Sequence, residues 1–428
     1  MRSNDKQPLV PKLRFPEFRD SGEWITVELG TLSKLVTERV GSTTCIPYTI
    51  TSGVGLISQE EKLGRTIAGN SLKNYLVLQE NDFAYNKSAT KAYPQGFIAL
   101  YAGDERAAVP NSIFTCFRVN QNQVIPTFLA ALFTSNLHGK WLRTRIAVGA
   151  RAHGSLQVSD DDLMATPVPL PNGTNSLEEQ QKIADCLSSL DELIAAELQK
   201  LNTLKTYKKG LMQQLFPREG ETAPRLRFTE FRNAEDWKEW KVGELGDVIT
   251  GNTPSTSKPQ YYEGEYNFVS PADISDQRFI ESTKTTLSKL GFEQTRQIPT
   301  GSVLFVCIGS TIGKVAQNMH LCATNQQINS LVPFSSFSGD FIYYLLLRES
   351  NRIAELAGNQ AVPIINKSTF SDVSVRCPQE KEEQERVAGY LGTLDDLIYA
   401  QSQKIDALKI HKKGLMQQLF PVLDEVSA

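Results

Sequence analysis

The residues nearest to a known chemical motif are Gly309-Ser-Thr-Ile-Gly313-Lys314, which resemble a phosphate-binding loop. The motif fails on spacing, because only three residues separate the glycines and Val315 stands where a Mg²⁺-binding hydroxyl is required. The sequence also lacks a dinucleotide-binding glycine fingerprint, a nucleophile elbow and an Asn/Asp-Pro-Pro-aromatic methyltransferase motif. The histidines have no partner at the spacing of a metal site or a catalytic triad: His138, His153, His320 and His411. We therefore expect no catalytic machinery in this chain.

Composition is that of a globular protein with more than one core. The chain has 428 residues, of which 40% are apolar, and a net charge of −3. The six cysteines are scattered without a CxxC pair, so we expect reduced, buried thiols rather than a zinc site or disulfides. The first residues contain no apolar signal core, and no apolar run is long enough to span a bilayer. These features predict a cytoplasmic protein.

The sequence contains an internal repeat. The decamer KKGLMQQLFP occurs at Lys208–Pro217 and again at Lys412–Pro421, 204 residues later. The flanking segments Glu178–Pro217 and Glu382–Pro421 match at about 24 of 40 positions without a gap. A second matching pair opens each copy, at Pro11–Phe18 and Pro224–Phe231. About 150 residues between these ends share little obvious sequence, so the copies are alike at their ends and different in their middles.

The matching ends predict two long helices. Apolar residues recur in steps of three and four along each, which predicts a narrow buried seam, and Ser176-Leu-Glu-Glu179 predicts a capping box. Pro217 and Pro421 should end the helices. About 35 helical residues span about 50 Å. The predicted seam consists of Ile183, Leu187, Leu190, Ile194, Leu201, Leu204, Val387, Leu391, Leu394, Ile398, Ile405 and Leu408.

Two packings could bury this seam. The helices could pack antiparallel on each other, as a coiled coil about a pseudo-twofold axis, or each could pack on its own domain. The narrow seam favours the coiled coil. The middles read as short strands, for example Tyr75–Leu78, Ile113–Val119 and Ile328–Val332, followed by helices at Pro126–Leu142 and Asp340–Leu356.

This order of elements resembles the specificity subunit of Type I restriction–modification systems. The resemblance covers essentially the whole chain and depends on the twin decamers, on Glu-Gln-x-x-Ile/Val-Ala at Glu179–Ala184 and Glu383–Ala388, and on Leu-Asp-x-Leu-Ile at Leu190–Ile194 and Leu394–Ile398. It implies an α+β fold with two β-rich target recognition domains, residues 1–175 and 218–378. Two conserved spacer helices, within residues 176–217 and 379–428, would form an antiparallel coiled coil.

The resemblance also implies partners and cofactors. Each variable domain would read one half of an asymmetric, bipartite double-stranded DNA target through the major groove. The helices would set the half-site spacing and dock two methyltransferase (modification) subunits, beside restriction/translocase subunits. S-adenosylmethionine, ATP and Mg²⁺ would be bound by the partner subunits. The duplicated decamer suggests two equivalent docking places, and the chain itself would be non-catalytic.

Candidate DNA contacts follow from side-chain chemistry within this resemblance. Arg and Lys bind guanine edges, Asn and Gln bind adenine, and Lys, Arg, Ser and Thr hold phosphates. In the first domain the candidates are Asn86, Lys87, Ser88, Lys91, Tyr93, Lys140, Arg143, Arg145, Arg151, His153 and Gln157. In the second they are Ser310, Thr311, Lys314, Thr324, Asn325, Gln326, Gln327, Asn359, Gln360, Asn366 and Lys367. The alternative for each set is a solvated surface loop or a helix face, and we expect at least one DNA contact in each patch.

Charge alone does not identify DNA as the ligand. Residues 30–171 carry 13 Lys and Arg against 10 Asp and Glu, and residues 247–378 carry 10 against 11. A bivalent adaptor for protein or glycan ligands is therefore a competing hypothesis, and a standalone nuclease is a third. A steep fall in affinity with salt would favour DNA over an uncharged ligand. We find no convincing carboxylate and lysine cluster of the kind that a nuclease needs.

Overall fold

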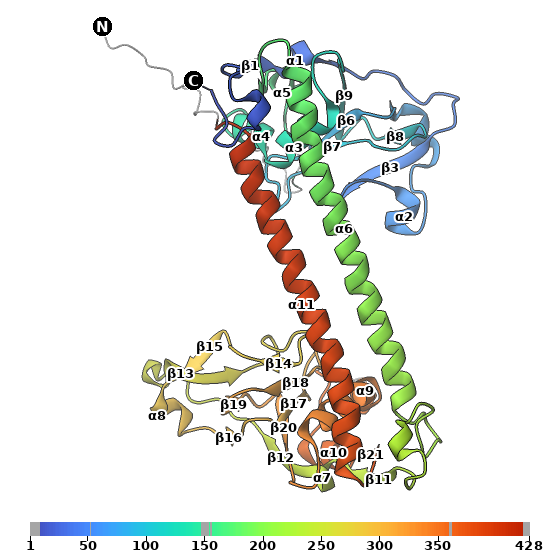
Figure 1. The fold of residues 1–428 in the computed structure, drawn as a ribbon, viewed down its shortest axis with the longest axis vertical. Helices are drawn as coiled ribbons and strands as arrows, with labels where there is room; N and C mark the ends of the chain where they lie inside the picture. Colours follow the sequence, from blue (N-terminus) through green and yellow to red (C-terminus); the bar gives the residue numbers. More distant parts are fainter. Residues whose placement is uncertain (1–8, 52, 147–153, 155, 359–361, 423–428) are drawn as a thin grey trace. The chain divides into compact units, whose positions relative to one another are not determined.

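A computed structural model describes residues 9–51, 53–146, 154, 156–358 and 362–422. The chain divides into two compact units, one made of residues 1–196 and 406–428 and the other of residues 197–405. The two long helices are shared between the units (Figure 1). Helix α6 (Ser176–Leu215) begins in the first unit and ends in the second, and α11 (Lys381–Leu419) begins in the second and ends in the first.

The first unit contains two four-stranded sheets and a small strand pair. One sheet has the order β2-β9-β6-β7, the other has the order β4-β3-β8-β5, and β1 pairs with β10. The strands are β1 (Ile25–Glu28), β2 (Ser33–Leu35), β3 (Ile46–Thr51), β4 (Gly55–Ser58), β5 (Leu76–Leu78), β6 (Asp82–Asn86), β7 (Phe97–Leu100), β8 (Ala107–Val109), β9 (Phe114–Val119) and β10 (Pro167–Leu170). The short helices are η1 (Pro16–Phe18), α1 (Leu29–Leu32), α2 (Gln59–Leu63), η2 (Gly69–Asn74), α3 (Pro126–Thr134), α4 (Leu137–Leu142) and α5 (Asp160–Met164).

The second unit repeats this plan with one additional strand, β14, in its first sheet. Its sheets have the orders β12-β20-β17-β18-β14 and β15-β13-β19-β16, and β11 pairs with β21. The strands are β11 (Lys238–Lys241), β12 (Gly246–Thr250), β13 (Tyr262–Val269), β14 (Phe279–Ile280), β15 (Thr285–Leu287), β16 (Gln297–Ile298), β17 (Val303–Val306), β18 (Val315–Asn318), β19 (Cys322–Thr324), β20 (Ile328–Pro333) and β21 (Ser374–Cys377). The short helices are η3 (Thr229–Phe231), α7 (Val242–Leu245), η4 (Pro259–Tyr261), α8 (Lys289–Phe292), α9 (Gly339–Glu355) and α10 (Lys367–Ser371).

The predicted strands and long helices are confirmed, with one helix interrupted. The segment expected as a single helix over Pro126–Leu142 forms α3 and α4, because Asn136 between them takes a left-handed conformation at φ 64°. An asparagine tolerates this conformation, but a helix cannot continue through it. Both long helices end two residues before the proline of the decamer, as expected, and the glycines Gly210 and Gly414 do not end them.

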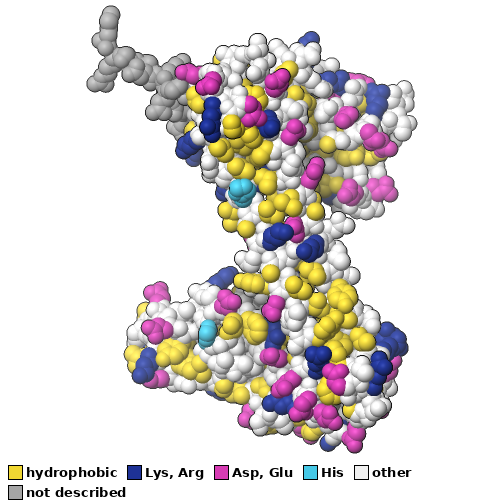
Figure 2. Space-filling view, in the orientation of Figure 1, with side chains coloured by type: hydrophobic (Ala, Val, Ile, Leu, Met, Phe, Trp, Pro, Cys, Tyr) yellow, Lys and Arg dark blue, Asp and Glu magenta, His cyan; other side chains and the backbone are white. Residues whose placement is uncertain are grey.

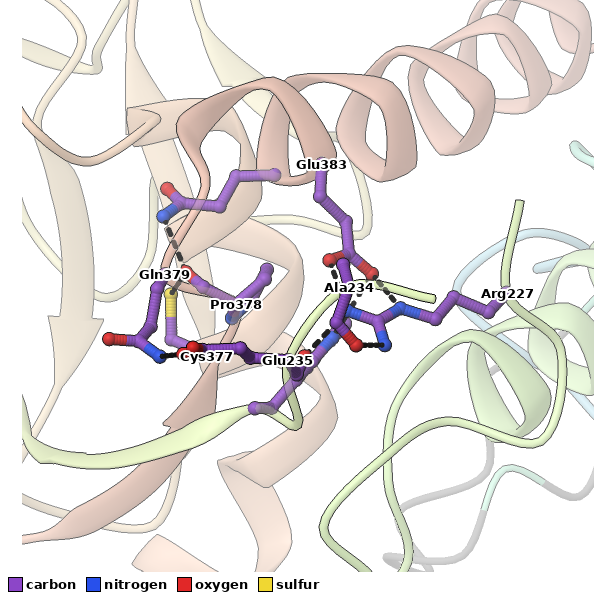
Figure 3. A network of polar contacts seen from close by, with 9 residues as sticks. Arg227, Ala234, Glu235, Cys377, Pro378, Gln379 and Glu383 are labelled. Atoms are coloured by element: carbon purple, nitrogen blue, oxygen red, sulfur yellow. Dashed lines mark hydrogen bonds and ion pairs between the residues drawn. The ribbon is translucent and has the colours of Figure 1, made fainter. Parts of the chain in front are cut away.

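Each long helix is anchored near its start to the segment that opens the same copy of the repeat. Glu179 accepts two hydrogen bonds from the Arg14 guanidinium and one from the indole of Trp24. Glu383 accepts the equivalent pair from Arg227, whose other N–H groups donate to the backbone oxygens of Ala234 and Glu235 (Figure 3). Both glutamates are 2% exposed. Paired guanidinium bonds compensate the cost of burying these carboxylates.

The capping box expected at Ser176-Leu-Glu-Glu179 is not formed. The Ser176 hydroxyl donates to the backbone oxygen of Pro171 at 2.6 Å, and the Glu179 carboxylate is engaged by Arg14. The prediction was wrong because a bidentate guanidinium contact is stronger than a bond to a single backbone N–H.

The glutamine that follows each of these glutamates joins the long helix to a shorter one. Gln180 Oε1 accepts from the backbone N–H of Ile125, which immediately precedes α3, at 2.9 Å. Gln384 Oε1 accepts from the backbone N–H of Ser338, which immediately precedes α9, at 2.8 Å. The Glu-Gln pair of the repeat therefore aligns the β-rich domain with its long helix in both units.

The apolar half of each decamer is buried in the core of the unit where its helix ends. In the second unit Leu215 and Phe216 join the core around Trp237 and Phe341. In the first unit Leu419 and Phe420 join the core around Trp24 and Phe128. Because these side chains are at most 6% exposed, they are part of the chain's own core and not of a docking surface.

Within each unit the two long helices run antiparallel. In the second unit Glu197 of α6 contacts Gln401 and Lys404 of α11, and Lys208 of α6 pairs with Asp395 of α11. In the first unit Lys412 of α11 pairs with Asp191 of α6. Glu197 and Gln401 are separated by 204 residues, which is the repeat period, so two equivalent positions meet. Such self-complementary pairing is typical of a twofold contact between helices.

The predicted seam faces inward, but the first part of it on each helix packs on the core of a β-rich domain. Ile183 and Leu187 belong to the first core, and Val387, Leu391 and Leu394 belong to the second core. The first third of each helix thus packs on its own domain, which was the alternative packing. Ile194 and Ile405 are also buried, and the remaining members are half-buried: Leu190, Leu201, Leu204, Ile398 and Leu408.

Candidate nucleic-acid interface

Three loops meet at one edge of the first unit. The backbone N–H of Lys87, which follows β6, donates to the oxygen of Ile113, which precedes β9. The Lys87 oxygen accepts from the N–H of Leu156, and Ala89 donates to the oxygen of Gly154. The predicted segments around Asn86–Ser88 and Gln157 are therefore brought together, although about 70 residues separate them in the sequence.

The same crossing occurs in the second unit. The backbone N–H of Cys307, which follows β17, donates to the oxygen of Gln327, which precedes β20. The Cys307 oxygen accepts from the N–H of Ile365, and Gly309 donates to the oxygen of Pro363. The structure thus gathers all three predicted segments of this unit, at Ser310–Lys314, Asn325–Gln327 and Asn366–Lys367.

The first-unit candidates differ in how freely they face solvent. Lys91 and Gln157 are exposed, Lys87 pairs with Asp160 at 3.5 Å, and Tyr93 packs on Phe97. Asn86 accepts a hydrogen bond from the N–H of Ser88, and both residues are half-buried. These side chains therefore form a mixed surface at the loop crossing.

The basic candidates near α4 lie beside this crossing. Lys140 and Arg143 are exposed, whereas Arg145 stacks over Trp141 with its guanidinium carbon 3.3 Å from the ring centroid. The Trp141 indole donates to the backbone oxygen of Asp162 in α5, which places α4 against α5. Arg151 and His153 lie outside the described residues.

The second-unit candidates divide into exposed and internally bonded side chains. Ser310 and Lys367 are exposed, Thr311 is half-buried, and the Lys314 ammonium donates to the backbone oxygen of Ile274 at 2.7 Å. That bond uses the lysine of the motif that resembled a phosphate loop. Asn366 caps α10 by accepting from the N–H of Thr369. Asn359 and Gln360 lie outside the described residues.

Thr324 is the candidate least suited to ligand contact, because it lies in β19 and is fully buried. Asn325 and Gln327 are half-buried and hydrogen-bonded to each other, which leaves Gln326 as the exposed member of this run. Sequence patterns alone could not separate these four neighbours.

Sequence reasoning missed Asn111 and Ser112. Both are exposed in the β8–β9 loop. Since Ile113 and Gln327 accept equivalent bonds at the two crossings, Asn111 and Ser112 correspond to Asn325 and Gln326. The strand order reveals this correspondence, whereas the two loop sequences share little. A search for amide-rich or basic runs therefore passes over the short Asn111-Ser112 pair.

The electrostatics of both units are mixed. On the face in Figure 2, basic and acidic side chains are interspersed over each unit. Burial raises the pKa of the Cys307 thiol to about 12, so this thiol beside the second crossing stays protonated at neutral pH. Within the described residues, no group of three His, Cys, Asp or Glu side chains could hold a metal ion. Among the described helices, none is long and apolar enough to cross a membrane.

Comparison with protein families gives a match over most of the chain. A family model described as a Type I restriction modification DNA specificity domain matches residues 64–206 and 234–409. The two matches correspond to the two copies of the repeat. The second match includes a whole β-rich middle and the first begins after β4, and each includes most of the long helix that follows.

Individual relatives agree with this match. The Type I restriction enzyme HindI specificity subunit of Haemophilus influenzae is 25% identical over 337 residues, covering 64% of this chain and 72% of that protein. A putative type I restriction enzyme MjaX specificity subunit of Methanocaldococcus jannaschii is 24% identical, covering 76% and 74%. The crystal structure of a Type I restriction–modification S subunit from M. genitalium shares the fold, with a TM-score of 0.59 and 14% identity over 97% of this chain and 100% of that one.

Proposed function

Because the chain belongs to the Type I restriction–modification DNA specificity family, we propose that each of its units reads one half of an asymmetric, bipartite DNA target. The observation that carries this proposal is the repeated loop crossing. Equivalent backbone bonds hold three loops together in both units, while the exposed side chains differ. An invariant scaffold with different side chains is what two different half-site sequences require.

The long helices would set the gap between the half-sites and dock two methyltransferase subunits. Leu193 of α6 and Leu397 of α11 occupy the same place in the repeat, and they are 41% and 50% exposed. Equivalent exposed leucines on two helices suit two copies of one partner, since burial of apolar surface drives association. The decamer would support this docking indirectly, by holding each helix end in a core.

The chemistry of modification and restriction would lie on partner subunits. We infer that S-adenosylmethionine is bound by the methyltransferase and that ATP and Mg²⁺ are bound by the restriction/translocase subunit. This chain would contribute sequence recognition alone. The glycine-rich turn at Gly309–Gly313 supports this division. In a phosphate-binding loop the lysine contacts the phosphates and a hydroxyl residue follows it. Here Lys314 donates to the backbone oxygen of Ile274, and Val315 follows it.

The test is co-expression of the full chain with its methyltransferase subunit, followed by sequencing of methylated adenine in the host genome. We expect a split, non-palindromic motif with one methylated adenine in each half. Binding of this complex to a matching duplex should weaken steeply as salt rises, because phosphate contacts release counterions. Methylation without a consensus sequence would contradict the proposal, and so would salt-independent binding.

A further inference from the structure

The amide-rich run Thr324-Asn-Gln-Gln-Ile-Asn329 contains four amide side chains, and the structure accounts for three of them internally. Asn325 Nδ2 donates to Gln327 Oε1, and Asn325 Oδ1 accepts from the backbone N–H of Gln327. Gln327 Nε2 donates to the backbone oxygen of Ile308. Asn329 is buried, accepts from the Thr250 hydroxyl at 2.6 Å and donates to Cys307 Sγ. These three amides hold the loop crossing together.

The fourth amide, Gln326, is exposed and is held by one hydrogen bond. Its Oε1 accepts a hydrogen bond from the Thr253 hydroxyl at 2.7 Å. This is the one bond found for its side chain within the described residues. The amide NH2 group, with two donor hydrogens, and the second lone pair of the amide oxygen are left for a ligand.

Thr253 lies in a loop whose neighbouring residues are hydrogen-bonded to other segments. Asn252 accepts from the backbone N–H of Arg296 at 2.8 Å and donates to the backbone oxygen of Gln294 at 2.9 Å. Gly251 donates to the oxygen of Ile328, and a Cβ at Gly251 would lie 2.2 Å from the backbone oxygen of Thr324. The β12–η4 loop can therefore approach the β19–β20 loop this closely because residue 251 is a glycine.

We propose that Gln326, oriented by Thr253, is the side chain with which the second unit reads an adenine in the major groove. This inference rests on the proposed function and deepens it. Adenine presents an N6 donor beside an N7 acceptor, and a glutamine amide matches that pair with Oε1 and Nε2. Because the hydrogen bond to the Thr253 hydroxyl already holds the end of this side chain in place, the amide loses less rotamer freedom when it meets the base.

The first test uses the full chain with its methyltransferase subunit and compares methylated motifs. Gln326→Ala should relax a single A·T position in one half-site, with discrimination there falling about tenfold to a hundredfold. Thr253→Val, which removes the hydroxyl and keeps the shape, should relax the same position less. Gln403→Ala changes an exposed glutamine on α11 and should leave the motif unchanged.

The second test measures binding to duplexes that carry 7-deazaadenine at the relaxed position. This analogue lacks the N7 acceptor, so the wild-type complex should bind it about tenfold or more weakly than adenine. The Gln326→Ala complex should bind both duplexes alike, because the two changes remove the same contact.

Several outcomes would overturn the role of Gln326. These are an unchanged motif in the Gln326→Ala complex, relaxation in both half-sites, or loss of all methylation with unchanged thermal unfolding. Equal wild-type affinity for adenine and 7-deazaadenine would also overturn it. A wild-type complex that methylates no bipartite sequence contradicts the proposed function instead, so the two failures are distinguishable.

Discussion

The first lysine of each decamer forms an ion pair in both units, but the two pairs lie in different surroundings. Asp191, the partner of Lys412 in the first unit, is 61% exposed. Asp395, the partner of Lys208 in the second unit, is 22% exposed and also accepts a hydrogen bond from the hydroxyl of Tyr344 at 2.6 Å. The repeat specifies the contact, whereas the neighbouring domain decides how far water screens it.

The second pair also continues into its domain. Tyr344 of α9 lies under the guanidinium of Arg278, which is 9% exposed and donates to Gln317 Oε1 in β18. A chain of polar contacts thus leads from the long helix to the sheet of the second unit. No equivalent chain is found from Asp191 within the described part of the first unit. Identical residues at equivalent positions of the repeat can therefore contribute differently to the free energy of unfolding.

Replacing the decamer phenylalanines by alanine should give the largest loss of stability. The two losses show whether both cores depend equally on these rings. Phe216→Ala and Phe420→Ala should each cost about 3–5 kcal/mol of unfolding free energy. Phe216 should cost about 1 kcal/mol more, because it packs on both Trp237 and Phe341, whereas Phe420 packs on Phe128.

Hydrogen exchange, followed separately in the two units, measures these losses. Each substitution should raise exchange most in the unit whose core contains the ring. The exposed decamer glutamines provide matched controls, since Gln213→Ala and Gln417→Ala should change little. Loss confined to the opposite unit would refute the assignment of the two rings.

Acidification should destabilise the first unit through His138, which has no part in the second unit. Burial lowers the pKa of His138 to about 4, so the folded first unit holds this ring neutral while the unfolded chain titrates near its ordinary value of 6.5. The stabilisation is present above pH 6.5 and is lost as the pH falls towards 4, by at most about 3 kcal/mol.

Denaturant unfolding of the wild type and of His138→Phe between pH 7 and pH 4 checks this sign. The variant should show a weaker pH dependence in the first unit, because the substituted ring does not titrate. The second unit should respond identically in both proteins. Equal pH dependence of the first unit in both proteins would show that His138 contributes nothing to it.

The smallest effect tests the ion pairs directly. Asp395→Asn should cost about 1.5–3 kcal/mol, because it weakens a charged, half-buried hydrogen bond, whereas Asp191→Asn should cost less than about 1 kcal/mol. A double-mutant cycle with Tyr344→Phe should show coupling to Asp395. Substitutions of the exposed neighbours Asp396 and Glu192 are the controls. Equal losses of stability for Asp191→Asn and Asp395→Asn would contradict the difference between the two ion pairs.

Much of the fold followed from local pattern. The strand at Ile113–Val119 and the helix at Asp340–Leu356 were predictable, because alternation and three-to-four spacing report which face is buried. The break at Asn136 was not, since a left-handed residue inside an apolar helical pattern leaves little trace in sequence. The capping box failed for a related reason, because the competitor for Glu179 lies 165 residues away.

The candidate interface was predictable in outline. The loops bearing Lys87, Gln157 and Lys314 were found from their composition, and the structure brings the first two together in one unit. Which residues of the amide-rich run Thr324–Asn329 are buried and which are exposed could not be predicted from the sequence. Thr324 is buried and Gln326 exposed although they are two residues apart, and the loops that hold them come from distant parts of the chain.

The sequence by itself determined that this chain is a duplicated unit with two long helices, two divergent β-rich middles and an inward-facing seam. Those features depend on periodicity and repetition, which are visible along the chain without knowing which residues meet in space. Only the tertiary structure decided that the decamers close the cores, that the two Lys–Asp pairs differ in exposure, and that Gln326 is the exposed amide of its run. Burial and hydrogen-bond competition decide such outcomes, and both depend on neighbours that are distant in sequence.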